Sequence, residues 1–262
     1  MRGSIIEAYG RIGTSQPDAL EPVVDDIRDS LAEAGLASNA AEALGEIGAA
    51  RPDIVEPAVA DLHELLADGD YLNRESAAVA LGKIGAADLD VASLVVDDLR
   101  TLTADDRQHG RAAAAEALGT IATADSNVAA QVGDDIRPLV NDDDRDVRSA
   151  ALEALGKTGV EDPETASLVL DDLQAGLRDV DPEVRSSAAN ALGAVGAAHR
   201  EFAPLATDAL CSRLERDDEY LYVRASIAEG LQSIKASHPD VVPLPSSELR
   251  GHIDAAADLL RE

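Results

Sequence analysis

Apolar residues recur along the chain at helical spacing, in two stripes that alternate. One stripe contains Val95, Val96, Leu99 and Leu102, and this spacing places the residues on one side of a helix. The other lies in Ala-rich segments such as residues 111–121, whose composition favours a helix with small buried positions. No stretch alternates apolar and polar residues for long enough to predict a strand. The pattern therefore predicts an all-α chain made of paired antiparallel helices.

The second stripe is an internal repeat with a period of 37 residues. Each of the five regular copies has an anchor leucine followed by glycine, a usually apolar residue three positions after the leucine, and a closing glycine, which is Ala122 in the copy anchored at Leu118. The anchors are Leu44, Leu81, Leu118, Leu155 and Leu192, with Tyr9 and Leu231 at this position in degenerate copies. The closing glycine is expected to end each helix in the left-handed conformation. The repeats predict a single domain of about six and a half helical hairpins over residues 1–237.

Other residues recur in register with the anchors. An arginine stands seven positions before the anchor in every copy except the second, which has Ala37. This column comprises Arg2, Arg74, Arg111, Arg148, Arg185 and Arg224. Prolines mark expected helix starts, because proline suits the first helical turn; they are Pro17, Pro52, Pro163 and Pro182. Pairs of aspartates, such as Asp97 and Asp98, are expected to face water from the first helix of each hairpin.

The two ends of the chain depart from the repeat. Residues 238–262 form a Pro-rich connection and a predicted C-terminal capping helix, with Ser247 as its N-cap. The predicted buried stripe of this helix is Ile253, Ala256, Ala257 and Leu260. At the other end, the chain opens inside a second helix with no first helix to cover its apolar residues Ile5, Ile6, Tyr9 and Ile12. We expect packing of this helix on a second copy or a partner, a natural start upstream of Met1, or a first helix that packs on the next repeat and tolerates some exposure.

The segment Asp181-Pro182-Glu183-Val184-Arg185, followed by Ala188-Ala189 and Leu192-Gly193, resembles the turn and second helix of HEAT repeats, in the short form first described in phycobilisome lyases. The resemblance implies an α-α superhelix, a HEAT-repeat solenoid with first helices on its convex side and second helices on its concave side. It also implies that the column arginines pair with acids four residues earlier, namely Asp70, Asp144 and Asp181. In the fourth copy the residue four positions before the column arginine is Arg107 and not an acid, so that turn should be held differently.

Charge narrows the classes of partner. The chain has 51 acidic and 22 basic residues, a net charge of −29, which repels the phosphates of nucleic acid. Aspartate exceeds glutamate, 32 to 19, and only three of the basic residues are lysines. This bias indicates a halophilic archaeon and a high-salt cytoplasm, where screening makes a large charge tolerable. One cysteine, no long apolar run and no leader also argue against disulfides, a membrane span and secretion.

Enzymes with similar repeats need residues that this chain lacks. The di-iron site of the deoxyhypusine hydroxylase family uses four His-Glu pairs, whereas only His63-Glu64 matches here. HEAT-like DNA glycosylases need a basic, aromatic concave face, and bilin lyases need aromatic residues around a tetrapyrrole, but aromatic residues make up 2% of this chain. Cys211 has no predicted catalytic neighbour and is expected to be inert. We expect no enzyme activity, cofactor, metal ion or catalytic residue.

The remaining hypothesis is a protein-binding scaffold or adaptor. The positions two residues before each anchor are expected to be exposed on the concave side. Glu7 and Glu153 at these positions are expected to pair with basic residues four positions later in the chain. Glu42, Glu116 and Asn190 are predicted to contact a partner protein. A basic cluster of Arg100, Arg107, His109 and Arg111 on the rim either docks an acidic partner or is neutralised by Asp105 and Asp106. Alternatives are a bilin-lyase-like or cofactor-handling protein and, among adaptors, a link between chemotaxis signalling and the motility motor.

Overall fold

The computed structural model describes residues 2–124, 126–216 and 218–259, and the side chains of all but Asp68, Tyr71, Ser126 and Leu259 among them. These residues are mostly helical and contain no strand. They form two compact units, Met1–Val128 and Ala129–Glu262. The predicted division into residues 1–237 and 238–262 stays a prediction. None of the described helices is both long and apolar enough to span a membrane.

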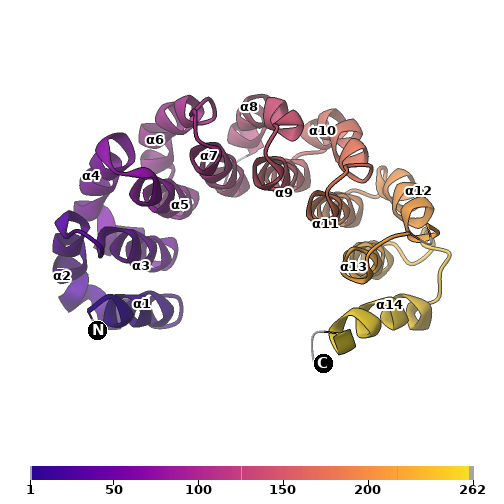
Figure 1. The fold of residues 1–262 in the computed structure, drawn as a ribbon, viewed down its shortest axis with the longest axis horizontal. Coiled ribbons are helices and arrows are strands. Elements are labelled where there is room, and N and C mark those ends of the chain that lie inside the picture. Colours follow the sequence, from indigo (N-terminus) through magenta and orange to yellow (C-terminus); the bar gives the residue numbers. More distant parts are fainter. Residues whose placement is uncertain (1, 125, 217, 260–262) are drawn as a thin grey trace. The chain divides into compact units, whose positions relative to one another are not determined.

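The first unit has two layers of helices (Figure 1). One layer holds the second helices of the repeats, packed in chain order: α1 (Arg2–Gly13), α3 (Ala37–Ala50), α5 (Tyr71–Ala87) and α7 (Gln108–Ile121). The other holds the first helices, α4 (Pro52–Asp68), α6 (Leu89–Leu102) and a broken helix made of η1 (Pro17–Val23), α2 (Val24–Asp29) and η2 (Ser30–Ala32). A short helix, η3 (Ala122–Ala124), follows α7. The predicted helical hairpins are therefore confirmed.

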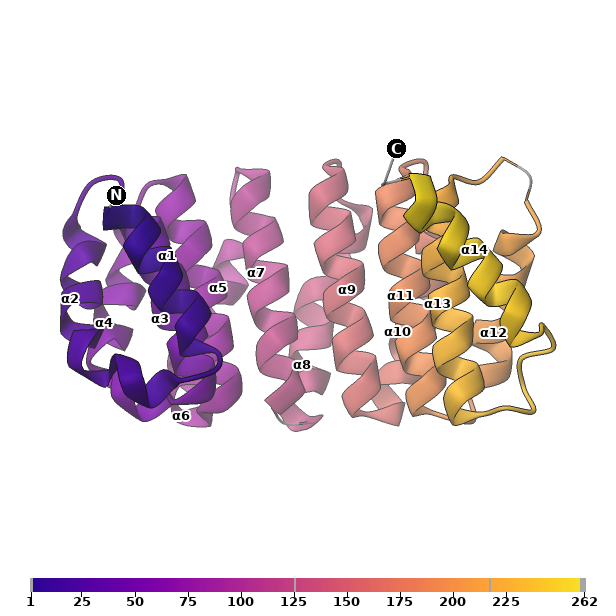
Figure 2. The same cartoon turned by 90° about the horizontal axis from the view of Figure 1, so that it is seen from below.

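The second unit repeats this plan. Its second helices are α9 (Arg145–Glu161), α11 (Pro182–Ala198) and α13 (Leu221–Ser237), which lie side by side in Figure 2. Its first helices are α10 (Pro163–Gly176), α12 (Ala203–Leu214) and a segment made of α8 (Ser126–Ile136) and η4 (Arg137–Asn141); α8 begins just before the boundary between the units. The last helix, α14 (Ser246–Leu259), packs across α13.

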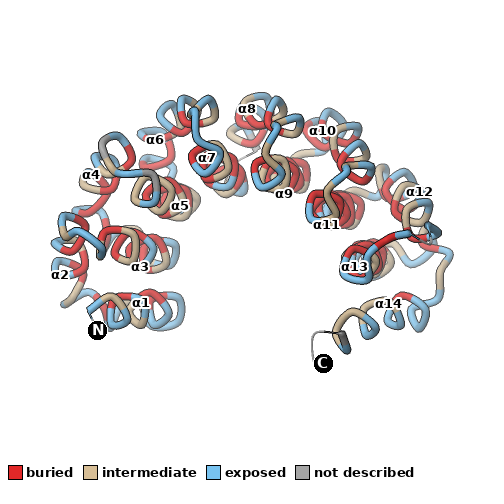
Figure 3. Tube along the Cα trace, viewed as in Figure 1, coloured by how far each residue is buried: buried red, intermediate tan, exposed pale blue. Residues whose placement is uncertain are grey.

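The core of each unit lies between its two layers, where Figure 3 shows the buried residues. The five anchor leucines are fully buried, and so are Val95 and Leu99 of the first-helix stripe. The glycine after the anchor lets neighbouring second helices touch: a Cβ atom on Gly45 would lie 2.8 Å from the Cα of Ala80, and one on Gly82 2.7 Å from the Cα of Ala117. Because real Cβ atoms do not approach so closely, these positions exclude any larger residue.

The expectation for the closing glycines was wrong. Gly48, Gly85, Gly159 and Gly196 lie inside α3, α5, α9 and α11, and among the described residues only Gly35 has a positive φ, of 81°. Packing explains why glycine is needed, since a Cβ atom on Gly48 would lie 2.6 Å from Ile84 and Val55. The helices end two residues later. Helix starts are as predicted: Pro17, Pro52, Pro163 and Pro182 each stand first in a helical segment.

The two ends differ in how well they are covered. Ile6 of α1 is buried, whereas Ile5 and Ile12 are 46% and 41% exposed. At the other end, α14 begins at Ser246, so Ser247 lies in its first turn and is not its N-cap. Among the described side chains of α14, Leu249 is the fully buried one. The predicted residues Ile253, Ala256 and Ala257 are half-buried, and Leu260 lies outside the described residues.

Candidate protein-binding surfaces

The turns before α9 and α11 share one construction. An aspartate six residues before the column arginine accepts a hydrogen bond from the backbone two residues on: Asp142 from Asp144 at 2.9 Å and Asp179 from Asp181 at 2.8 Å. The backbone oxygen of the same aspartate accepts a bond from the arginine; Arg148 donates to Asp142 at 2.8 Å. The arginine therefore fixes the turn before its own helix.

The same arginines also join successive repeats. Arg148 donates hydrogen bonds to both carboxylate oxygens of Asp179, at 2.8 and 2.9 Å. Arg74 contacts Asp105 at 2.8 Å, and Arg2 contacts Glu33 at 2.6 Å. In all three pairs the acid lies 31 residues after the arginine. We call this contact the repeat clamp.

The predicted partners of the arginine column were therefore wrong. Asp70, Asp144 and Asp181 are N-caps, whose carboxylates accept backbone hydrogen bonds at the starts of α5, α9 and α11. The carboxylate of the aspartate four residues before the arginine therefore caps the start of its own helix and does not pair with the arginine. Two further arginines of the column, Arg111 and Arg224, donate to the backbone oxygens of Asp105 and Arg216, at 2.9 and 2.7 Å.

The last clamp is a buried network around Glu219, whose carboxylate is fully buried. Arg185 binds it with Nε at 2.9 Å and Nη2 at 2.7 Å, and Arg213 binds it from α12. Burial would raise the pKa of Glu219, but the bonds from Arg185, the backbone of Tyr220 and Arg213 lower it below its ordinary value. Asp179 behaves alike: burial raises its pKa, and the bonds from Arg148 and Asp181 outweigh this.

The basic cluster of the sequence lies at the turn before α7. Arg107 stands at the N-cap without a side-chain cap bond, so the start of this helix differs from those of α5, α9 and α11. Its backbone N–H donates to Asp105 at 2.8 Å, as in the turns before α9 and α11, so the prediction that this turn is held differently applies to the cap alone. Asp105 also holds Arg74 of the preceding repeat, which ties its carboxylate to the clamp. Arg107 and His109 are exposed, and Arg100 is half-buried and contacts Asp97 at 2.9 Å.

The aspartate pairs of the first helices are exposed except for Asp135 and Asp172, which are half-buried, and not all of them face only water. The second aspartate of a pair binds a basic residue of the preceding first helix: Asp98 contacts His63 at 2.6 Å and Asp172 contacts Arg137 at 2.8 Å. Nowhere in the described part of the chain do His, Cys, Asp and Glu gather in a group that could hold a metal ion. Cys211 is half-buried, and burial, followed by Glu215, raises the pKa of its thiol.

The predicted contact residues lie on what we call the second-helix face, the surface formed by the positions two residues before each anchor. All of these residues are exposed except Val79, which is half-buried. In the first unit they are Glu7, Glu42, Val79 and Glu116; in the second unit they are Glu153, Asn190 and Glu229. Neither Glu42 nor Glu116 uses its carboxylate in a bond to another described residue.

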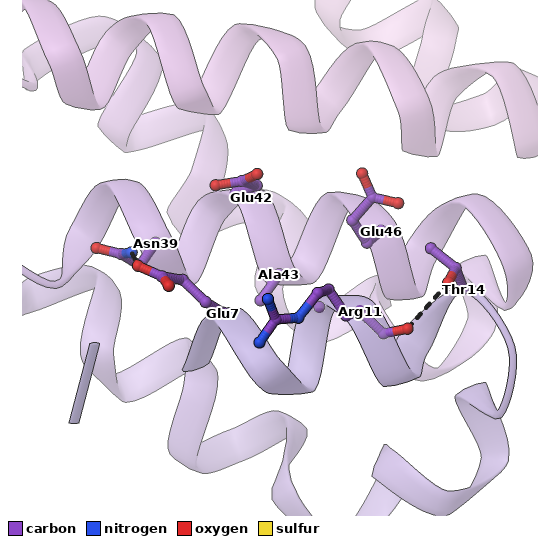
Figure 4. A pocket seen from close by; sticks show the side chains of 8 residues that line it. Glu7, Arg11, Thr14, Asn39, Glu42, Ala43 and Glu46 are labelled. Atoms are coloured by element: carbon purple, nitrogen blue, oxygen red, sulfur yellow. Dashed lines mark hydrogen bonds between the residues drawn. The ribbon is translucent and has the colours of Figure 1, made fainter. Parts of the chain in front are cut away.

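A pocket of about 440 Å³ opens on this face between α1 and α3 (Figure 4). Within it, Asn39 donates a 2.8 Å hydrogen bond to Glu7, so the carboxylate of Glu7 is directed to α3 and not held by the predicted pair with Arg11. Glu153 likewise accepts a bond from Ser187 of the next repeat, at 2.7 Å, in place of the predicted pair with Lys157. Glu42 and Glu46 also line the pocket, and Glu46 is bound by Lys83 at 2.6 Å.

Paired helices in two layers, repeated at a fixed period, define an α-solenoid. The chain belongs to the HEAT-repeat family: the family model described as HEAT repeats matches residues 96–171 and 139–232. The model described as PBS lyase HEAT-like repeat matches residues 36–68. No curated protein matches the chain.

Solved structures agree on the fold. An engineered protein from the Northeast Structural Genomics Consortium is 24% identical with a TM-score of 0.58, and the match covers 81% of this chain and 98% of that one. A second engineered protein from the same consortium is 22% identical with a TM-score of 0.57, covering 82% and 97%. A designed armadillo repeat protein in complex with the peptide (KR)4 is 18% identical with a TM-score of 0.56, covering 80% and 98%. At such identities the likeness concerns the fold alone.

Proposed function

We propose that this chain is a non-enzymatic scaffold that holds an extended basic segment of a partner protein on the second-helix face of its first unit. One observation carries the proposal: Glu42 of α3 and Glu116 of α7 expose carboxylates that bond no other described residue, at the same position of their repeats. Unpaired carboxylates on fixed helices suit lysine and arginine side chains. The designed armadillo repeat protein of similar fold, which is in complex with (KR)4, supports this choice of ligand.

The test is binding of fluorescein-labelled (KR)4 peptide by fluorescence anisotropy, at several salt concentrations. Glu42→Gln and Glu116→Gln together should weaken binding by about tenfold, since two charge contacts are removed. The matched control changes Glu56 and Glu64 of α4, which are exposed in the other layer, to Gln. An equal loss in the control variant would mean diffuse attraction to a chain of charge −29 and would overturn the proposal.

The wider role follows as part of the same proposal: an adaptor in a high-salt cytoplasm, for which a link between chemotaxis signalling and the motility motor is one candidate. The alternative is a bilin-lyase-like or other cofactor-handling protein, favoured in name by the match to PBS lyase HEAT-like repeats over residues 36–68. Visible absorbance of the chain purified from its source separates the two. A bound chromophore would favour the alternative.

A further inference from the structure

The start of α13 differs from the starts of its neighbours in the second unit. Helices α9 and α11 begin with an N-cap aspartate whose carboxylate accepts a backbone hydrogen bond, followed two positions later by an acid that suits the helix dipole. In α13 these two places are taken by Tyr220 and Tyr222, and the N-cap makes no side-chain bond. This repeat therefore gives up two stabilising features at the turn.

The residues that replace them are exposed. Tyr220 is 58% exposed and Tyr222 42%, with ring centroids 6.0 Å apart, and Leu221 between them is 42% exposed. Val180, at the preceding turn, is 91% exposed. We call these four residues the tyrosine rim. It holds two of the four tyrosines of a chain in which 2% of residues are aromatic. Tyrosine is enriched where protein interfaces gain most of their binding energy.

The tyrosine rim rests on the buried network around Glu219. The carboxylate of Glu219 accepts a bond from the backbone of Tyr220 at 2.9 Å. Arg185, which binds the same carboxylate, donates to the backbone oxygen of Val180 at 3.1 Å. One buried ion pair therefore fixes the backbone at both turns. A backbone fixed in this way loses little conformational entropy when a partner binds.

A basic groove adjoins the tyrosine rim. It lies between α10 and α12, has a volume of about 680 Å³, and is lined by three arginines and one acid, Asp208. Arg213 and Arg216 are paired with Glu219 and Asp218, whereas the exposed guanidinium of Arg178 bonds no other described residue. Leu177, Pro204 and Leu205 supply an apolar wall. Arg213 connects groove and rim, because it shares Glu219 with the backbone of Tyr220.

We infer that the tyrosine rim and this groove together dock an acidic segment of a partner protein that carries an apolar side chain. The guanidinium of Arg178, which bonds no other described residue in a chain of net charge −29, selects a ligand of negative charge, and the exposed rings and apolar wall select an apolar side chain. Carboxylates of the segment pair with Arg178. The carboxylates of the segment avoid the side of Tyr222 that faces Glu183 and Asp181. Burial is the largest cause that raises the pKa of Tyr222, and these two acids raise it further. This surface is separate from the one that holds a basic segment.

The test uses a fluorescently labelled peptide of repeated Asp-Glu-Leu triplets and measures its affinity for the chain by fluorescence anisotropy. Arg178→Glu should weaken binding of this peptide by about tenfold, and so should the double change Tyr220→Ser with Tyr222→Ser. A peptide with Ser in place of Leu should bind the parent chain about tenfold more weakly. Arg250→Glu is the matched control, because Arg250 is exposed on α14 and this substitution changes the charge by the same amount as Arg178→Glu. Glu42→Gln with Glu116→Gln should leave this affinity unchanged, so failure of one proposal does not imply failure of the other.

Tyr220→Asp separates binding from stability. It restores an N-cap aspartate, so the melting temperature should rise while affinity for the acidic peptide falls about tenfold. Three results overturn the inference: no binding of the peptide by the parent chain, equal effects of Arg178→Glu and Arg250→Glu, or unchanged affinity in Tyr220→Asp. Light scattering that shows a dimer lost on Tyr220→Ser would also overturn it and would assign the surface to a second copy.

Discussion

Arg148 and Asp179 form a two-point ion pair across the boundary of two repeats, with nitrogen to oxygen distances of 2.8 and 2.9 Å. Their side chains are only 13% and 15% exposed, so the pair lies in a less polar environment than a surface ion pair. The arginine also holds the turn before its own helix, and the aspartate also holds the turn before the next helix. Each clamp therefore couples local turn structure to the stacking of repeats.

Removal of one member of the clamp should be costly. Asp179→Ala leaves the guanidinium of Arg148 without its carboxylate in a mostly buried place, and the free energy of unfolding should fall by about 3 kcal/mol. Urea unfolding followed by circular dichroism measures this. The control is Asp240→Ala, which removes the exposed partner of Arg200 and should cost much less, because water screens an exposed ion pair. Equal losses for the two variants would contradict a special role for the clamp.

Acid should weaken the fold through the same carboxylates. The folded-state pKa values of Glu219 and Asp179 lie below their ordinary values of 4.5 and 3.8, so both groups contribute stability above those values. That contribution is lost as the pH falls through the ordinary pKa toward the lowered one. Urea unfolding between about pH 6 and pH 3 should show the decline, and Glu219→Gln should make it shallower. The same pH dependence in both proteins would argue against Glu219 as a source.

Stability should depend on salt. Even with every basic residue paired, a charge of −29 remains, and it is spread over helices that stack closely. Transfer from molar salt to about 0.1 M lengthens the screening distance from about 3 to 10 Å, which increases repulsion between aspartates of adjacent helices. The midpoint of thermal unfolding, followed by circular dichroism, should therefore be lower in dilute salt. Equal midpoints would mean that the excess charge does not oppose folding.

The basic cluster before α7 should contribute to partner binding. Arg107 and His109 are exposed at this turn, and Asp105 beside them also binds Arg74 of the preceding repeat. Changing Arg107 and His109 together to Glu should reduce capture of an acidic partner from lysate of the source organism at native salt, with the helical signal unchanged. Glu56→Gln with Glu64→Gln, on α4 of the same unit, serves as the control. Equal recovery of the partner by the variant and the parent would leave the cluster as a turn element.

Helix α1 should mediate self-association through its exposed isoleucines. Ile5 and Ile12 lie seven residues apart and are 46% and 41% exposed, whereas Ile6 is buried and its change would damage the core. Light scattering at high salt should give a larger mass for the parent chain than for Ile5→Ser with Ile12→Ser, because exposed apolar residues favour association. Leu168→Ser, at an exposed position of α10, is the control. A parent of monomer mass would end this hypothesis.

The hairpins and the core could be predicted because the anchor leucines recur at one period and every repeat buries the same position. The repeat clamp was not predicted, because acids were sought within one turn of each arginine. An offset of 31 residues, visible in Arg2 and Glu33 and in Arg74 and Asp105, would have revealed it. The closing glycines were misread, because packing against a neighbouring helix and a helix stop both require glycine. The tyrosine rim emerges only when the starts of α9, α11 and α13 are aligned.

Each clamp spans less than one period and joins only adjacent repeats, so no contact of this kind depends on how many repeats the chain contains. Duplication or loss of a whole repeat preserves every remaining pair. A change of spacing within a repeat is also accommodated, since Arg185 pairs with Glu219 across 34 residues in place of 31. The architecture can therefore change length by gene duplication without redesign of its joints. A family built on it can match partners of different size by the number of repeats alone.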